Sequence, residues 1–247
     1  MIGRIKACLN GGRRTADHPA VPVTPAELAV AAAGAVAAGA EALHLHPRDP
    51  GGRETLNASD IGAAVAAVRS AGVPVGVSTG LWMTGGDPAR RRLLVRGWAR
   101  LATPERPEFA SVNVSETGFA DLVAALAEAG ILAEAGAWSV DDAEGLPEVG
   151  VERVLIEVID APPAEAVATA DAIIARLDRR GITAPRLLHG EGEACWPLIA
   201  HAGRLGLPTR IGLEDTLVNP DGTPAIDNAD LVRRAVDLWT SHAGRLR

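Results

Sequence analysis

Short runs of β-branched and aliphatic residues alternate with longer alanine-rich stretches along the whole 247-residue chain. The short runs suit strands and the long ones suit helices, and this alternation is typical of a parallel sheet covered by helices. Eight such pairs can be counted. The predicted strands are 4–9, 42–46, 74–78, 109–114, 132–134, 153–159, 185–189 and 209–213, and the predicted helices begin near Pro25, Ser59, Pro88, Glu116, Val140, Pro163, Ala194 and Asn228.

The number of these units predicts a closed barrel. Eight strand and helix pairs in about 250 residues is the usual size of a (β/α)8 barrel. An open doubly wound sheet often carries GxGxxG after its first strand, whereas this chain has Asn10-Gly11-Gly12-Arg13 there. The first helix has a clear start, because Thr24 can cap it, Pro25 suits its first position and Glu27 can complete a capping box. With no linker visible, we expect an α/β fold, a single (β/α)8 TIM barrel domain spanning residues 1–247.

Composition narrows the possible partners. With 47% hydrophobic and 22% charged residues the chain lies within globular norms, and its net charge of -7 argues against nucleic acid and against an anionic membrane. Residues 1–8 do not resemble a signal peptide, and the weakly polar run 28–40 is too short to span a bilayer. Cys8 and Cys195 suggest buried thiols in a reducing compartment. We therefore predict a cytoplasmic protein that binds a small molecule.

Polar side chains collect where the predicted strands end, which is where the reacting groups of a (β/α)8 barrel lie. These residues are Asn10, His44, His46, Ser78, Thr79, Asn113, Ser115, Glu134, Glu157, His189, Glu191, Glu214 and Asp215.

The most informative element is the pair His44 and His46 at the end of the second strand. Side chains alternate across a strand, so both imidazoles point to one side while Leu43 and Leu45 point to the other. Two imidazoles suit Zn²⁺, and a catalytic zinc site needs a third protein ligand and an open position. Glu214, at the end of the eighth strand, is the candidate third ligand. The alternative is that both histidines are hydrogen-bonded residues of the barrel mouth without a metal.

Arg210 and Asp215 flank this candidate ligand in the segment Arg-Ile-Gly-Leu-Glu-Asp. A carboxylate beside a metal ligand and near a guanidinium is a suitable general base, because the positive charge favours its ionised form. The alternative is a structural ion pair and a helix cap.

Several further residues are expected to contact the substrate. Ser78 and Thr79 can donate hydroxyl groups to a carboxylate, although Ser-Thr-Gly is as often only a turn. Asn10 and Asn113 are expected to bind substrate at the ends of the first and fourth strands, and Trp82 is expected to form a wall. Glu134 is expected to line the pocket or to pair with an arginine. The sequence assigns no role to His189, Glu191, Arg13 and Arg14.

Five segments, taken in order along nearly the whole chain, resemble the β-keto acid cleavage enzymes. They are Ala7-Cys8-Leu9-Asn10-Gly11-Gly12, Pro22-Val23-Thr24-Pro25-Ala26-Glu27, His44-x-His46-x-Arg48-Asp49, Ser78-Thr79-Gly80 and Arg210-x-Gly212-x-Glu214-Asp215. HxHxRD followed far downstream by RxGxED is specific as a combination, although either half alone is weak.

The resemblance implies a zinc-dependent barrel that converts a β-keto acid and acetyl-CoA into acetoacetate and a new acyl-CoA. It implies that His44, His46 and Glu214 bind the metal, that Asp215 is the base oriented by Arg210, and that Ser78 helps to hold the substrate. Barrels of this family tend to assemble, so we expect a homo-oligomer. Members that take an amino-bearing substrate resemble this chain poorly in the first loop, so the substrate side chain stays open.

Two other functions compete with this interpretation. Amidohydrolase-type metal-dependent hydrolases also use HxH, but on the first strand, with further histidines on strands five and six. The second is a non-catalytic barrel, which would hold no stoichiometric metal.

Overall fold

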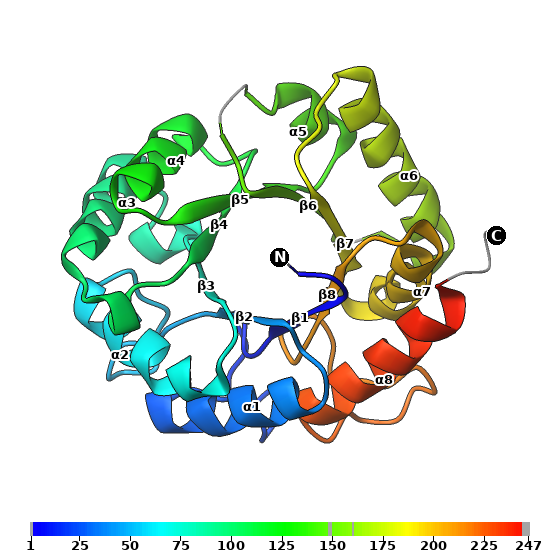
Figure 1. The fold of residues 1–247 in the computed structure, drawn as a ribbon, viewed down its shortest axis with the longest axis horizontal. Helices are drawn as coiled ribbons and strands as arrows, with labels where there is room; N and C mark the ends of the chain where they lie inside the picture. Colours follow the sequence, from blue (N-terminus) through cyan, green and yellow to red (C-terminus); the bar gives the residue numbers. More distant parts are fainter. Residues whose placement is uncertain (1, 148–149, 160, 244–247) are drawn as a thin grey trace.

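Eight parallel strands form a nearly closed barrel surrounded by helices (Figure 1). The structure is a computed structural model and describes residues 2–147, 150–159 and 161–243. The strands are β1 (Ile5–Cys8), β2 (Ala42–Leu45), β3 (Val75–Ser78), β4 (Phe109–Asn113), β5 (Leu132–Ala137), β6 (Arg153–Val158), β7 (Arg186–Gly190) and β8 (Thr209–Ile211). The helices are α1 (Pro25–Ala37), α2 (Ala58–Val68), α3 (Pro88–Arg96), α4 (Phe119–Glu128), α5 (Val140–Gly145), α6 (Pro163–Arg179), α7 (Cys195–Leu205) and α8 (Asn228–His242). Short 3₁₀ helices are η1 (Arg69–Ala71), η2 (Leu81–Thr84), η3 (Gly97–Arg100), η4 (Thr103–Glu105) and η5 (Gly192–Ala194).

The strand order confirms the predicted (β/α)8 barrel. Each strand from β2 to β6 pairs with both of its sequence neighbours, β7 pairs with β6, and β1 pairs with both β2 and β8. The remaining seam is bridged where the Leu188 amide of β7 donates to the Pro208 carbonyl just before β8, at 3.0 Å. Because β1 lies between β2 and β8, residues at the ends of β2 and β8 can meet above it.

All eight predicted strands are present, and each predicted helix starts within three residues of the observed one. The difference that matters is in β5, which continues to Ala137 instead of ending at Glu134. Its added residues pair on both sides, since Gly136 lies opposite Asn113 and Ala137 lies opposite Ile156. Glu134 therefore lies inside the barrel rather than at its mouth.

The start of α1 shows how local sequence fixes an element. The Glu27 amide donates to Thr24 Oγ1 at 3.3 Å, and the Thr24 amide donates to Glu27 Oε2 at 2.8 Å. This is the predicted capping box, with Pro25 at the first helical position.

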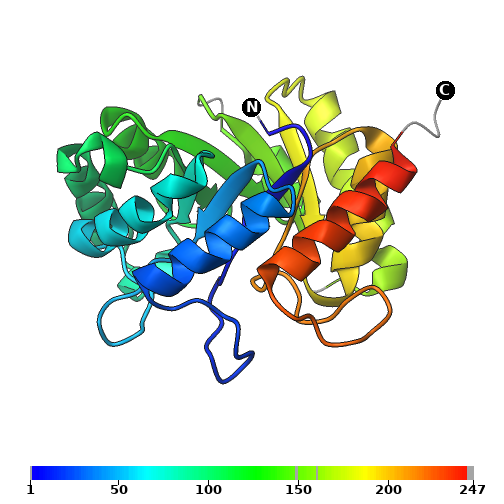
Figure 2. The same ribbon diagram turned by 60° about the horizontal axis from the view of Figure 1, so that its bottom comes forward.

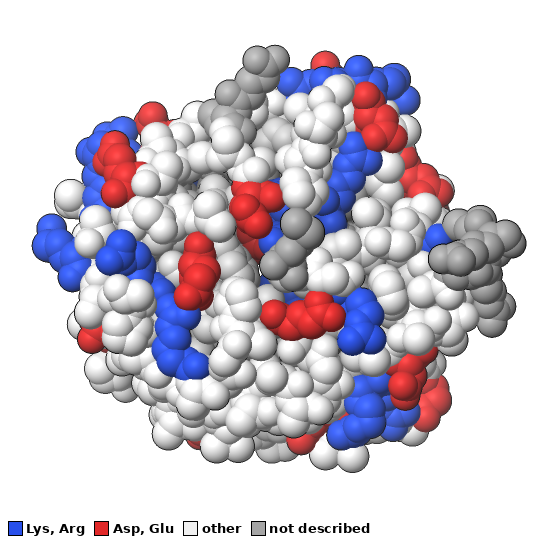
Figure 3. Space-filling model, in the orientation of Figure 1, with Lys and Arg blue, Asp and Glu red and all other residues white. Residues whose placement is uncertain are grey.

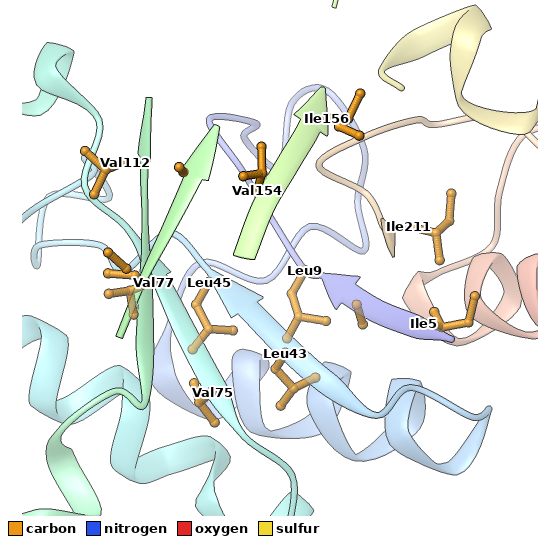
Figure 4. Packing of buried hydrophobic residues seen from close by; sticks show 14 of the residues in the cluster. Ile5, Leu9, Leu43, Leu45, Val75, Val77, Val112, Val154, Ile156 and Ile211 are labelled. Atoms are coloured by element: carbon orange, nitrogen blue, oxygen red, sulfur yellow. The ribbon is translucent and has the colours of Figure 1, made fainter. Parts of the chain in front are cut away.

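Two apolar clusters hold the barrel together. The larger fills the space between strands and helices, where Leu43, Leu45, Val75 and Val77 pack (Figure 4). The smaller lies inside the barrel near the amino-terminal ends of the strands, and consists of Ile2, Ala42, Phe109, Leu155 and Leu187. The carboxyl-terminal half of the interior is left to polar side chains.

The loops at the carboxyl-terminal ends of the strands rise on one side of the molecule. Figure 2 shows the loop after β1 (blue) and the loop after β8 (orange) projecting in the same direction. Over the face seen in Figure 3, Lys and Arg side chains are interspersed with Asp and Glu. Within the described part of the chain, no helix has both the length and the apolar character needed to cross a membrane.

Candidate metal centre and active site

His44, His46 and Glu214 converge above β1. His44 Nε2 lies 3.8 Å and His46 Nε2 lies 3.6 Å from Glu214 Oε2, and the potential ligand atoms of the three residues all lie within 4.8 Å of one another. A glycine allows this approach, because a Cβ on Gly11, whose φ is +53°, would lie 2.5 Å from Glu214 Cγ. The three residues predicted to bind metal are therefore together.

The donor set fits a divalent transition metal. Glu214 Oε2 is buried and has no hydrogen-bond partner among the described residues, although it faces both imidazoles. Two imidazole nitrogens and one carboxylate oxygen are the ligands of many catalytic zinc sites, which leave one position for substrate or water. An acceptor left without a donor between two histidines is what such an ion would satisfy.

The three side chains also have strongly altered pKa values. Burial holds the pKa of His44 well below its usual value. Burial lowers the pKa of His46 as well, but the carboxylates of Glu214 and Glu54 outweigh it and bring that pKa to about 9. Burial disfavours the Glu214 carboxylate, yet Arg210 and the histidines hold its pKa well below the usual value. His46 therefore carries a proton that a bound cation would displace.

Arg210 joins both carboxylates that follow β8. Its Nη2 donates to Glu214 Oε1 at 2.9 Å and its Nε donates to Asp215 Oδ1 at 2.9 Å. Burial raises the pKa of Asp215 to about 7, and Arg210 only partly opposes that effect. We expected the guanidinium to keep this carboxyl group firmly ionised; desolvation outweighs it because Asp215 is wholly buried.

A cavity of about 340 Å³ opens next to the three potential ligands and Arg210. Of the residues expected to contact the substrate, Ser78, Asn113 and Trp82 line this cavity. Ser78 of β3 and Ser111 of β4 form part of its wall.

Asn10 and Thr79 do not line the cavity, in contrast to the prediction. The Asn10 side chain is buried; its Nδ2 donates to the carbonyls of His46 (2.9 Å) and Pro22 (3.1 Å), and its Oδ1 accepts from the His46 amide (2.9 Å). The Thr79 hydroxyl donates to the Ser111 carbonyl at 2.6 Å. Both side chains are used to fix backbone around the site. Asp215 is likewise not part of the cavity wall.

Glu134, which is also expected to contact the substrate, does not line the cavity. Its Oε2 lies 2.7 Å from Lys6 Nζ and its Oε1 lies 2.7 Å from Arg153 Nε, with all three side chains buried. It pairs with an arginine, the alternative left open from the sequence, and forms a buried ionic group beneath the cavity.

Two carboxylates to which the sequence assigns no role, Glu54 and Glu157, lie at the site. Glu54 Oε1 is 2.5 Å from His46 Nδ1, and Glu157 lines the cavity, where its Oε2 accepts from Trp138 Nε1 at 3.0 Å. Burial raises the pKa of Glu157, but His189 and Arg210 outweigh it, and the pKa falls to about 2. The end of a strand pointed to Glu157, whereas no motif pointed to Glu54, which follows an Asp-Pro-Gly-Gly turn.

The residues left without a role are now placed. Arg13 and Glu191 line the cavity mouth, with Arg13 Nη2 at 4.0 Å from Glu191 Oε1, while Arg14 lies outside it beside Asp17. His189 is buried on β7, 3.6 Å from Glu157 Oε1, and burial lowers its pKa to about 4. No histidine lies on β5 or β6, which removes the amidohydrolase pattern.

Comparison with known proteins gives a family match. The profile described as beta-keto acid cleavage enzyme matches residues 4–144 and 163–245. Among solved structures, apo ObcA superposes with a TM-score of 0.68 at 19% identity, covering 89% of this chain and 61% of that one. ObcA in complex with a C4-CoA adduct and oxalate matches equally, with 63% of that chain covered. The chain thus spans a little over three-fifths of the ObcA length.

A solved structure of lower identity matches over most of its length. The 3-dehydroquinate dehydratase from Geobacillus kaustophilus gives a TM-score of 0.61 at 13% identity, covering 96% of this chain and 92% of that one. At such identities the likeness shows the fold alone.

Proposed function

The chain belongs to the β-keto acid cleavage enzyme family, and from this premise we propose that it transfers an acyl group from a β-keto acid to CoA, with acetyl-CoA as co-substrate and acetoacetate as product. The observation that carries the proposal is the convergence of two imidazoles and one carboxylate beside a cavity of about 340 Å³. The ObcA complex with a C4-CoA adduct supports CoA chemistry on this fold.

His44, His46 and Glu214 would hold a zinc ion. When bound, the ion would supply a Lewis acid for the oxygens of the β-keto acid. The chain's own contribution is to present these three ligands on the ends of β2 and β8, and to keep Glu214 ionised through Arg210 Nη2. Glu214 cannot serve as the base while its free oxygen is a ligand.

Ser78 and Asn113 would hold the substrate from the opposite wall. Both side chains are buried and line the cavity, and the Ser78 hydroxyl is free to donate because the Gly80 amide only donates to its oxygen, at 3.4 Å. Trp82 closes one side of the cavity with a half-exposed indole. Together they would orient a short, polar substrate toward the metal ligands.

Glu157 and Asp215 are the candidates to accept the proton from the carbon between the two carbonyl groups. Glu157 lines the cavity, but with a pKa of about 2 it is a weak base near neutral pH. Asp215 matches the family motif, and its Oδ2 has no hydrogen-bond partner among the described residues. We assign the base to Asp215, with Arg210 orienting it; since Asp215 is wholly buried, this role requires the adjoining wall to open when substrate binds.

The proposed reaction needs no covalent enzyme intermediate. The deprotonated carbon attacks the acetyl carbonyl of acetyl-CoA, and the C–S bond breaks to release the CoA thiolate. The thiolate adds to the former ketone, and the bond between that carbon and the attacking carbon breaks. The products are the new acyl-CoA and acetoacetate, which takes back the proton from Asp215.

Further proposals accompany the activity. We propose that residues 1–247 form one barrel domain, that the protein is a cytoplasmic homo-oligomer, and that it does not bind nucleic acid. Both cysteines are free and buried, as expected from the sequence. Light scattering of the purified protein measures the oligomeric state.

A panel of β-keto acids with acetyl-CoA tests the activity, with acetoacetate and acyl-CoA measured by mass spectrometry. We expect the wild type to turn over at least one substrate, and His46→Gln to lose both turnover and zinc. His201→Gln is the matched control, because His201 Nε2 also faces a carboxylate, that of Asp171 at 2.7 Å, but on helix α7. A wild type that binds no zinc and releases no acetoacetate would leave the non-catalytic barrel as the explanation.

A further inference from the structure

Glu54 contacts both a potential metal ligand and a wall of the cavity. Its Oε1 lies 2.5 Å from His46 Nδ1, and its Oε2 accepts from Trp82 Nε1 at 3.1 Å. The Trp82 ring stacks on the His46 ring, with centroids 6.4 Å apart and planes inclined by 22°. One carboxylate therefore joins an imidazole and an indole that are stacked on each other.

The contact with Glu54 determines which nitrogen of His46 faces the metal position. A carboxylate only accepts, so Nδ1 must carry the hydrogen, and the lone pair of the metal-bound imidazole is then on Nε2, which points at Glu214 Oε2. His44 differs, because its Nδ1 has no hydrogen-bond partner among the described residues. Of the two imidazoles, only that of His46 has its orientation fixed by a hydrogen bond from Nδ1 to a described residue.

Glu54 is itself held firmly. It belongs to a short antiparallel bridge between Arg48 and Glu54, closed by a turn in which Gly52 has a φ of +77°. Arg48 Nη1 lies 3.9 Å from Glu54 Oε2, and Arg48 also donates to the carbonyls of Gly11 and Arg13. The Glu54 side chain is only 15% exposed. Its position is therefore tied to the β1–α1 loop that forms the cavity mouth.

Trp82, in contrast, depends on Glu54 for its place. Its side chain is half exposed, and its indole lies flat over Gly80, where a Cβ would be 2.1 Å from the ring. Glycine at this position gives the ring space without fixing its rotation, so the hydrogen bond from Nε1 to Glu54 and the stacking on His46 set its orientation.

We propose that Glu54 is a positioning residue that fixes the metal-binding tautomer of His46 and, with its second oxygen, holds Trp82 as the cavity wall. The inference rests on the proposed metal centre. Glu54 accepts one hydrogen bond from His46 Nδ1 and one from Trp82 Nε1. A residue at position 54 with only one acceptor oxygen could serve only one of these two donors.

Glu54→Gln creates that competition without changing size. If the amide oxygen accepts from His46 Nδ1, the NH₂ group faces the Trp82 N–H, and two donors meet. If the amide turns over, its NH₂ faces His46 Nδ1, which must then accept, so the hydrogen moves to Nε2 and that nitrogen cannot bind a metal. Trp82→Phe removes the competing donor, so Glu54→Gln should be partly rescued by Trp82→Phe.

Zinc affinity of the apo protein, measured by competition with a chromophoric chelator, tests the proposal. We expect Glu54→Gln to weaken zinc binding about 10- to 100-fold, in line with other partners of metal-bound histidines. Trp82→Phe alone keeps the His46 contact and should stay within about threefold of wild type. The double variant should bind zinc more tightly than Glu54→Gln alone. Trp138→Phe is the matched control, because its indole N–H faces Glu157 in the same cavity, and it should bind zinc like wild type.

The outcomes separate this inference from the proposed function. Equal zinc affinity of wild type and Glu54→Gln, or a double variant no better than Glu54→Gln, would overturn the role of Glu54 while leaving the metal centre intact. A wild type without zinc affinity would overturn the metal centre and this inference with it. Should Glu54→Gln not fold, the ¹⁵N signals of His46 in zinc-loaded wild type decide the matter: binding through Nε2 with hydrogen on Nδ1 is expected, and binding through Nδ1 would refute the proposal.

Discussion

Replacing Glu134 with Gln should strongly destabilise the barrel. Glu134 lies 2.7 Å from Lys6 Nζ and 2.7 Å from Arg153 Nε, and its side chain is 0% exposed. The substitution keeps the shape of the side chain but removes its charge. Lys6, also 0% exposed, is then left in the interior without its counterion.

The magnitude follows from the burial of the group. Removing one partner of a buried ion pair costs about 3–5 kcal/mol, because the remaining charge is neither solvated nor paired. That is a large part of the roughly 5–15 kcal/mol by which native domains are stable. For a chain of this length each kcal/mol lowers the melting temperature by about 2–4 °C, so a fall of about 6–20 °C is expected.

Thermal and urea unfolding followed by circular dichroism measure the fall in melting temperature and the loss of unfolding free energy. KM for the β-keto acid is measured under conditions in which the variant is folded. The matched control is Glu128→Gln, which removes a carboxylate paired with Arg96 on the surface and should leave the midpoint unchanged. Unchanged stability in Glu134→Gln together with a raised KM would refute the structural role and restore the interpretation of Glu134 as a substrate contact.

Three further changes give separate predictions. Arg210→Ala should lower kcat by about 100-fold or more with a smaller effect on KM, because it removes a preorganised donor to Glu214 and Asp215; an unaltered kcat would contradict this. The pKa of His189 is about 4 in the folded protein against about 6.5 in an unfolded chain, so the unfolded state takes up this proton first and the contribution of neutral His189 to stability should fall by roughly 3 kcal/mol between pH 6.5 and 4. In urea titrations the wild type should therefore lose about 3 kcal/mol more than His189→Gln over this pH range, and equal changes in the two proteins would contradict the assignment. Thr24→Ala should cost about 1 kcal/mol in the same assay by removing the cap of α1, and a cost near zero would show that the capping box adds nothing.

Periodicity and helix caps predicted the fold because they are local. The Thr24-Pro25-Glu27 start of α1 depends on residues within one turn, and the structure contains the expected capping box. The same holds for the alternation of Leu43 and Leu45 with His44 and His46, which needs only the pleat of one strand. Such features do not depend on what lies across the barrel.

The depth at which a side chain lies inside the barrel could not be predicted in the same way. The segment after Glu134 is Ala-Gly-Ala, which has low strand propensity, so the strand was expected to stop there. It continues because β4 and β6 supply partners on both sides. Three extra residues place Glu134 well below the mouth, next to Lys6. Because neighbouring strands extend β5, Glu134 forms a structural ion pair at a position where the sequence predicts a substrate contact.

Side chains that serve the backbone also escaped sequence reasoning. Asn10 at the end of a strand was expected to face the substrate, yet its amide is fully engaged with the backbone of His46 and Pro22. Nothing in the sequence distinguishes an amide that binds a ligand from one that ties a loop to a strand. The distinction depends on which carbonyls face it after folding.

Small interior side chains near the carboxyl-terminal ends of the strands leave room for the cavity. β3, β4 and β5 contribute Ser78, Ser111 and Gly136, whereas β6 and β8 contribute the larger Glu157 and Arg210. A Cβ on Gly136 would lie 2.8 Å from Asn113 Oδ1 and 3.1 Å from Glu157 Oε1, so even one methyl group there would press on the cavity wall. Ser78 and Ser111 line the cavity, and β3, which carries Ser78, pairs with β2, which carries His44. In the proposed function, the metal held by His44, His46 and Glu214 would take the oxygens of the substrate, and its remaining atoms on the other side would contact Ser78 and Asn113. Bulk on that second side should therefore limit which β-keto acids are accepted.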